Sequence, residues 1–192
     1  ELDEELRGWN DVDGTSWGRD LKRLWKGWPR RDAPSLVAET ATRHNFEDFG
    51  TVVAETADGV DYDPDCTDAA LDLSQGPPRL YFMKLDGPRP LAVSRITRHL
   101  AVTQCLAALG LDDDFYLVVH APTDHPTVDG LRAFRVPPRH FVQLHRGTWH
   151  AGPLWGTDSH RTFVNLELAN TNLDDHHSDD HPSLIPVVLP ER

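Results

Sequence analysis

Residues 144–150 carry two histidines, His145 and His150, with four residues between them. Gly147 lies between them and allows the chain to bend. Two imidazoles at this spacing can bind a metal ion or act as an acid–base pair. The chain has 11 histidines, so near pairs also arise by chance, and a purely structural pair is an equally good interpretation.

Strand alternation extends this candidate site to three segments, because alternate side chains of a strand share one face. If a barrel has a polar interior face, such side chains meet in a common cavity. The candidates are Arg95 and His99 in residues 91–99, Gln143 and His145 in residues 141–145, and Asn165 and Glu167 in residues 161–168.

A second histidine cluster, His176, His177 and His181, lies among aspartates at positions 174, 175, 179 and 180. Its composition resembles a metal site. We nevertheless favour a solvated terminal segment, because acidic and His-rich tracts near a terminus are commonly exposed.

Other chemistries lack their motifs. The chain has no Gly-rich phosphate loop, no G-x-S-x-G elbow and no C-x-x-C pair. Cys66 and Cys105 allow one disulfide at most, which excludes a disulfide-rich scaffold. The net charge of -12 argues against nucleic-acid binding, and no apolar run is long enough to span a bilayer.

The elements that must position these residues are short strands separated by Gly, Pro and Asp turns, typical of an all-β barrel or jelly roll. Residues 42–49 predict a helical turn, residues 58–75 a loop, and residues 102–109 a strand or short helix. Prolines restrict a last strand at 184–189 to a sheet edge. The other predicted strands cover residues 36–39, 51–55, 80–85, 91–97, 115–120, 131–136, 141–145 and 161–168.

Residues 1–35 are predicted to form a Trp-rich N-terminal extension to a single domain of residues 36–192. The extension holds four of the six tryptophans, and exposed tryptophans usually have a partner surface. We expect it to pack on its own domain or on a dimer mate, with docking to a different protein as the alternative.

Several segments resemble the ureidoglycolate lyases. The strongest likeness is His145-Arg146-x-x-Trp149-His150, followed by Pro153-Leu154 and the strand that ends at Glu167. Further matches are Arg98-His99 with Thr103-Gln104, Asp129-x-Leu131-Arg132-Ala133-Phe134, and Phe46-Glu47-Asp48-Phe49-Gly50. The likeness covers roughly residues 36–175.

The resemblance implies a cupin-like double-stranded β-helix, a homodimer, and cleavage of ureidoglycolate into glyoxylate and urea. In the cupin metal pattern, His99 resembles the first ligand and His150 the last. Gln104 stands where a glutamate is usual, and Ala101 replaces the second histidine. We therefore expect no metal cofactor, and at most a weak divalent site at His99, Gln104 and His150.

The elimination needs a base for the substrate hydroxyl, an acid for the departing urea and a cation for the carboxylate. The resemblance makes His99 and His150 the acid–base pair, with Glu167 orienting a histidine. The remaining candidates are His145 as a further catalytic residue, Arg95 or Arg146 for the carboxylate, Gln104 and Gln143 for the urea amide, and Trp149 as a substrate contact.

Two departures from the family keep other functions open. The family's Asn-Gly segment is missing from residues 58–79, and the Trp-rich extension is additional. The first hypothesis is a lyase with a small carboxylate substrate and no nucleic-acid or membrane partner, located in the cytoplasm or an organelle lumen. The second is a non-catalytic scaffold or accessory subunit docked through its extension, and the third is a metal-dependent cupin enzyme.

Overall fold

The computed structural model describes residues 34–157 and 159–190, and the regular secondary structure of these residues is almost entirely β-strand. Two short helices interrupt the strands, η2 (Val128–Gly130) and α3 (Thr171–Asp174). The strands are β1 (Leu36–Thr40), β2 (Gly50–Ala54), β3 (Pro78–Leu85), β4 (Ala92–Arg98), β5 (Cys105–Ala108), β6 (Phe115–His120), β7 (Arg132–Val136), β8 (His140–Leu144), β9 (Trp149–Leu154), β10 (Arg161–Leu168) and β11 (His177–Val188).

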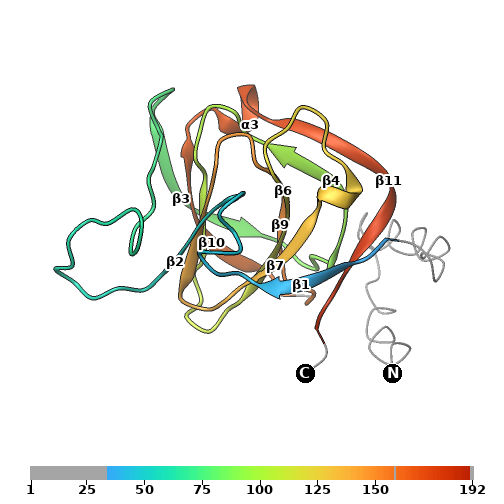
Figure 1. The fold of residues 1–192 in the computed structure, drawn as a ribbon, viewed down its shortest axis with the longest axis horizontal. Coiled ribbons are helices and arrows are strands. Elements are labelled where there is room, and N and C mark those ends of the chain that lie inside the picture. The colour runs from blue at the N-terminus through green and yellow to red at the C-terminus, as the bar shows by residue number, and fades with distance from the viewer. Residues whose placement is uncertain (1–33, 158, 191–192) are drawn as a thin grey trace. The chain divides into compact units, whose positions relative to one another are not determined.

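The strands form two sheets, one of which closes into a barrel (Figure 1). The closed barrel has the order β1-β11-β4-β9-β6-β7, and the second sheet has the order β2-β8-β5-β10-β3. This arrangement confirms the predicted all-β barrel and is consistent with a cupin-like fold. Helical turns also occur where predicted, since Phe46 N donates to Thr42 O and Gly50 N donates to Phe46 O.

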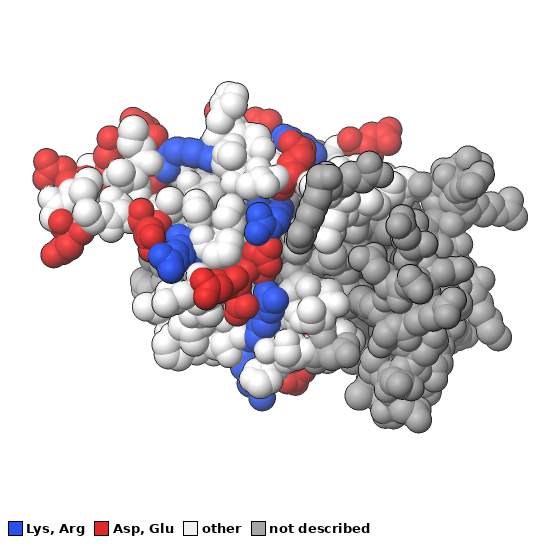
Figure 2. Space-filling model, turned by 90° about the horizontal axis from the view of Figure 1, so that it is seen from below, with Lys and Arg blue, Asp and Glu red and all other residues white. Residues whose placement is uncertain are grey.

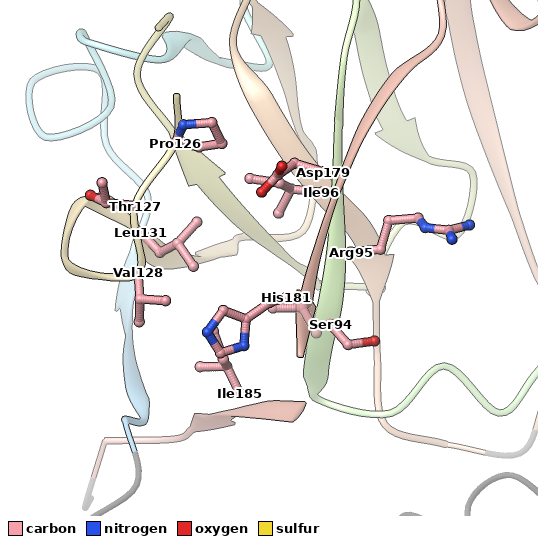
Figure 3. Close-up of a pocket in the computed structure, with 11 residues that line it drawn as sticks. Ser94, Arg95, Ile96, Pro126, Thr127, Val128, Leu131, Asp179, His181 and Ile185 are labelled. Atoms are coloured by element: carbon pink, nitrogen blue, oxygen red, sulfur yellow. The ribbon is translucent and has the colours of Figure 1, made fainter. Parts of the chain in front are cut away.

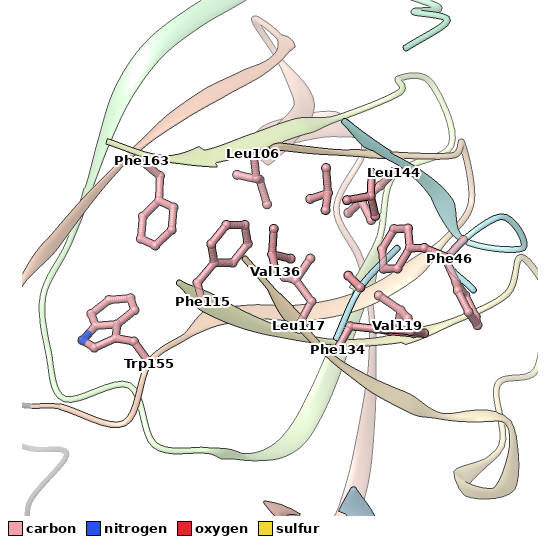
Figure 4. Packing of buried hydrophobic residues seen from close by; sticks show 14 residues of the cluster. Phe46, Leu106, Phe115, Leu117, Val119, Phe134, Val136, Leu144, Trp155 and Phe163 are labelled. Carbon is pink, nitrogen blue, oxygen red and sulfur yellow. The ribbon is translucent and has the colours of Figure 1, made fainter. Parts of the chain in front are cut away.

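Apolar side chains pack on both faces of β6, which explains its continuous apolar sequence. Phe115, Leu117 and Val119 join the main core, the cluster that fills the space toward the five-stranded sheet (Figure 4). Tyr116 and Val118 join a second cluster with residues of β4, β9 and β11. The prediction of a strand at 115–120 that is buried on both faces is therefore confirmed.

The C-terminal segment departs from its prediction. Residues 177–188 form the long strand β11, which pairs with β4 on one side and with β1 on the other. The last strand is thus an interior strand of the barrel, and its prediction as an edge is wrong. The register shifts between Asp180 and Ile185, and this irregularity accommodates Pro182 within a paired strand.

The surface of the described residues carries mixed charge. On the face drawn in Figure 2, acidic and basic side chains lie next to one another, and no broad basic surface appears there. None of the helices in residues 34–157 and 159–190 is long and apolar enough to cross a membrane. Residues 1–33 of the predicted N-terminal extension lie outside the described residues, so the extension stays a prediction.

Candidate functional site

Two of the predicted histidines lie together in the interior. His99 follows the end of β4, and His150 lies on the adjacent strand β9 directly opposite Thr97. Their ring centroids are 5.2 Å apart, and both side chains are buried. His150 also pairs in register with Val119 of the main core. The pair therefore sits where the barrel wall meets the main core.

Backbone carbonyls determine which nitrogen of each ring carries the proton. His99 Nδ1 lies 2.5 Å from the carbonyl oxygen of Asp175, and His150 Nδ1 lies 3.1 Å from that of Thr148. A carbonyl oxygen only accepts hydrogen bonds, so each Nδ1 must be the donor. Each neutral ring then has an unprotonated Nε2, and neither Nε2 has a hydrogen-bond partner among the described residues.

Both histidines are neutral near pH 7. Burial lowers the pKa of His150 from 6.5 to about 3, and repulsion from His99 in its protonated form adds to this shift. Burial also lowers the pKa of His99, although Asp175 and Glu167 oppose that shift. Burial removes the water that would stabilise a charged imidazole, so the neutral form is favoured. Neutral rings with a free Nε2 can accept protons.

We predict that acidification destabilises the fold through His150. Between pH 6.5 and pH 5 the unfolded chain binds a proton at this residue and the folded chain does not, so the free energy of unfolding falls by about 2 kcal/mol. Urea denaturation at pH 7.5 and pH 5 measures the loss. His150→Asn should reduce it, whereas exposed His44→Asn should leave it unchanged. Equal pH dependence in both variants would contradict the prediction.

Asp175 and His176 from the C-terminal segment complete the surroundings of His99. The Asp175 carboxylate accepts hydrogen bonds from the backbone N–H groups of Leu100 and Ala101, both at 2.8 Å, and so holds the turn that carries His99. The ring centroid of His176 lies 5.8 Å from that of His99. His176 is exposed, but Asp175 is buried, so the segment is only partly the solvated tail that we predicted.

Glu167 lies at the centre of a second polar cluster on β10. Its side chain is 1% exposed, and each carboxylate oxygen accepts several hydrogen bonds. The donors to Oε2 are Gln104 Nε2 and Asn165 Nδ2. The donors to Oε1 are Tyr81 Oη, Asn172 Nδ2 and Arg79 Nη1, the last at 3.4 Å. Glu167 therefore orients amides, and in this structure it does not hydrogen-bond to a histidine.

An electrostatic effect links the histidine pair to the Glu167 cluster. The negative charge of Glu167 raises the pKa of His99, but less than Asp175 does. Strand pairing explains how the Glu167 cluster forms: Asn165 pairs with Tyr81 on β3 and with Leu106 on β5, and Gln104 immediately precedes β5. The structure thus brings His99 together with His150 and Gln104 together with Glu167, and we take these four predicted residues as the candidate site.

Two predicted arginines are engaged elsewhere. Arg95 is exposed, and its Nη2 donates to Asp180 on β11 at 3.0 Å. Arg146 donates to the carbonyl oxygen of Leu100 at 2.7 Å and to Asp72 at 2.6 Å. Arg146 thereby ties the segment after His99 to the loop before β3. The structure does not bring either guanidinium to the histidine pair.

Three further candidates point to other sides of their strands. Trp149 precedes His150 on β9, so alternation turns it to the second core cluster, where its Nε1 donates to Thr123 O. Gln143 lies between Val142 and Leu144, both in the main core, and therefore points to the opposite face of the five-stranded sheet. His145 is exposed beyond β8, and its Nε2 lies 3.1 Å from Glu47 O. The predicted convergence fails for Gln143 and His145, and Trp149 packs in the core instead of facing the histidine pair.

Tyr81, Asn172, Asp175 and His176 belong to the site but were not predicted. Alternation within residues 80–85 assigns Tyr81 to one face of its strand, but only the pairing with β10 shows that this face points inward. Asn172 comes from α3, and Asp175 follows that helix. For His176 the sequence held a signal in the C-terminal histidine cluster, but we interpreted that cluster as a solvated segment.

Two hollows lie away from this site. One, of about 50 Å³, is lined mainly by apolar side chains of β4, β11 and the η2 region, including Ile96, Leu131 and Ile185. Figure 3 shows Arg95 beside it with its guanidinium directed away. The other, of about 390 Å³, includes His145, His44 and Glu47. His99, His150, Gln104 and Glu167 do not line either hollow.

Metal binding has limited support. The described residues contain no group of three or more His, Cys, Asp or Glu side chains arranged to hold a metal ion. The predicted weak site at His99, Gln104 and His150 has only two imidazoles and a neutral amide oxygen as donors. It stays a prediction, and no step of the chemistry below depends on it.

The fold and the site define an all-β barrel protein with a buried, uncharged histidine pair and a buried carboxylate–amide network. Residues 33–185 match the family model described as Ureidoglycolate lyase. The chain belongs to the ureidoglycolate lyase family, and this membership supports a lyase-like function. No curated protein matches the chain significantly.

Proposed function

We propose that this protein cleaves ureidoglycolate, or a similar small carbinolamide acid, into glyoxylate and urea. The observation that carries the proposal is the buried pair of neutral imidazoles, each with an unprotonated Nε2. A buried base that stays neutral at physiological pH is available for proton transfer without first losing a proton. Family membership supports this choice of substrate class.

The chemistry requires one proton to move from oxygen to nitrogen. His99 Nε2 takes the proton of the carbinol hydroxyl, the C=O bond of glyoxylate forms, and the C–N bond breaks. The resulting imidazolium returns the proton to the departing ureido nitrogen, which leaves as urea. Asp175 and Glu167 favour the protonated form of His99, so the proton resides on His99 rather than on His150, whose pKa is about 3.

Arg79 is our candidate cation for the substrate carboxylate. Its side chain is 45% exposed at the rim of the Glu167 cluster, and its guanidinium stacks on the Tyr81 ring with 3.8 Å to the centroid. Only Nη1 faces Glu167, at 3.4 Å. A planar guanidinium has further N–H groups, and paired N–H groups match a carboxylate well.

The direct test incubates purified full-length protein with ureidoglycolate, with and without a chelator, and follows glyoxylate. We expect glyoxylate at the same rate in both arms, because the proposed steps use only side chains of the chain. Loss of activity only with chelator would replace this mechanism with metal-dependent chemistry. No glyoxylate in either arm contradicts the proposed function and favours the non-catalytic scaffold.

A further inference from the structure

The carboxylate of Glu167 determines the direction of every hydrogen bond around it. An ionised carboxylate only accepts hydrogen bonds, so the groups that contact it must be donors. Gln104 therefore presents its NH₂ group to Glu167 Oε2, at 3.2 Å, and Asn165 presents its own NH₂ group to the same oxygen, at 3.0 Å. Neither amide can be turned over without placing two oxygens in contact.

The same network also uses the second N–H group of each amide. Gln104 Nε2 also donates to Asn165 Oδ1 at 3.2 Å, and Asn165 Nδ2 also donates to Tyr81 Oη at 3.0 Å. Both N–H groups of Gln104 are thereby used within the protein. What remains of its side chain is the carbonyl oxygen, Oε1, which can only accept.

Gln104 Oε1 has no hydrogen-bond partner, although it is buried. The whole residue is 7% exposed. A buried acceptor without a partner costs about 1–3 kcal/mol, and such groups in native proteins call for an explanation. Here the unpartnered oxygen belongs to a side chain whose two N–H groups are both used by Asn165 and Glu167.

We propose that Gln104 is the specificity-determining residue of this site and that its Oε1 accepts a hydrogen bond from an N–H group of the ligand. This assignment rests on the proposed function and gives the ureido group of the substrate its recognition partner. The site then favours ureido and amide compounds over ketones of the same shape. Because Oε1 is closed to solvent here, a ligand reaches it when a side chain at the rim moves.

Four acids with one heavy-atom skeleton test this directly. Hydantoate has N–H groups at both positions, succinamate only at the terminal one, and N-acetylglycinate only at the internal one. Levulinate has none. Hydantoate lacks the carbinol hydroxyl and cannot undergo the elimination, so binding is measured at equilibrium by calorimetry. We expect hydantoate to bind about 10- to 100-fold more tightly than levulinate.

Two glutamine variants provide the matched comparison. Gln104→Met removes the acceptor at nearly constant volume and should abolish the preference for hydantoate. Gln143→Met replaces another buried glutamine, which lies on the opposite face of the sheet, and should keep the preference. Circular dichroism checks that both variants fold. The comparison of the four acids on wild-type protein tests the inference even if a variant does not fold.

The possible outcomes separate this inference from the proposed function. If a buried water satisfies Oε1, levulinate binds as tightly as hydantoate, and the inference is overturned. No measurable binding of any of the four acids overturns it as well. A preference for hydantoate without glyoxylate formation supports the inference and refutes the lyase. Glyoxylate formation without a preference for hydantoate supports the lyase and refutes the inference.

Discussion

Replacing His99 by asparagine is expected to lower kcat/KM for ureidoglycolate by about 10²- to 10⁴-fold, the usual contribution of a general acid–base residue. Asparagine places an N–H group near the position of Nδ1, so the hydrogen bond to Asp175 O can persist. It removes Nε2, the atom that moves the proton. The fold should therefore survive the change while the chemistry is lost.

His145→Asn is the matched control for this variant. His145 lies in the segment that carries His150, but it is exposed and contacts Glu47 O on another side of the protein. We expect its kcat/KM to stay within about twofold of wild type, as for most surface changes. Comparable losses in the two variants would mean that the site lies near His145, and an active His99→Asn variant would refute the proton-transfer role.

The sequence predicted the strands better than their partners. Residues 115–120 and 161–168 match β6 and β10 because their apolar or alternating patterns are local properties. β9 was missed because its residues, among them Gly152 and Pro153, are not typical of a strand. β11 was misjudged because acidic and His-rich residues read as solvated, and only pairing with β4 and β1 makes them a barrel strand.

The candidate site shows the same limit. Alternation assigned Asn165 and Glu167 to one face of a strand, and the family resemblance singled out His99, Gln104 and His150. Alternation does not say which face is inward, so Gln143 was expected inside although Val142 and Leu144 take that face. Trp149 and His150 were both predicted to face the site. Neighbouring residues of a strand point to opposite faces, so a strand through both can turn only one of them toward it.

Glu167→Met is expected to lower the free energy of unfolding by about 2–4 kcal/mol, because it leaves buried donors of Gln104 and Asn165 without their acceptor. Urea denaturation at pH 7.5 measures the change, provided that its slope is unaltered. Glu55→Gln is the control: Glu55 is exposed and contacts Arg139 at 3.5 Å, so its loss should stay below about 0.5 kcal/mol. Similar losses would mean that Glu167 does not organise the cluster.

Glu167→Gln should behave differently, because an amide lets the network reverse. If the new NH₂ group takes the place of Oε2, Gln104 and Asn165 can both turn over, and Tyr81 Oη can donate to Asn165 Oδ1. The hydrogen bonds among Gln104, Asn165 and residue 167 are then kept in reverse and only the outer group of Gln104 lacks a partner, as it does now, so this variant should lose less stability than Glu167→Met. Gln104 would now present N–H instead of Oε1, and its preference for hydantoate over levulinate should disappear. A destabilisation equal to that of Glu167→Met, with the preference retained, would show that the carboxylate does not set the orientation of Gln104.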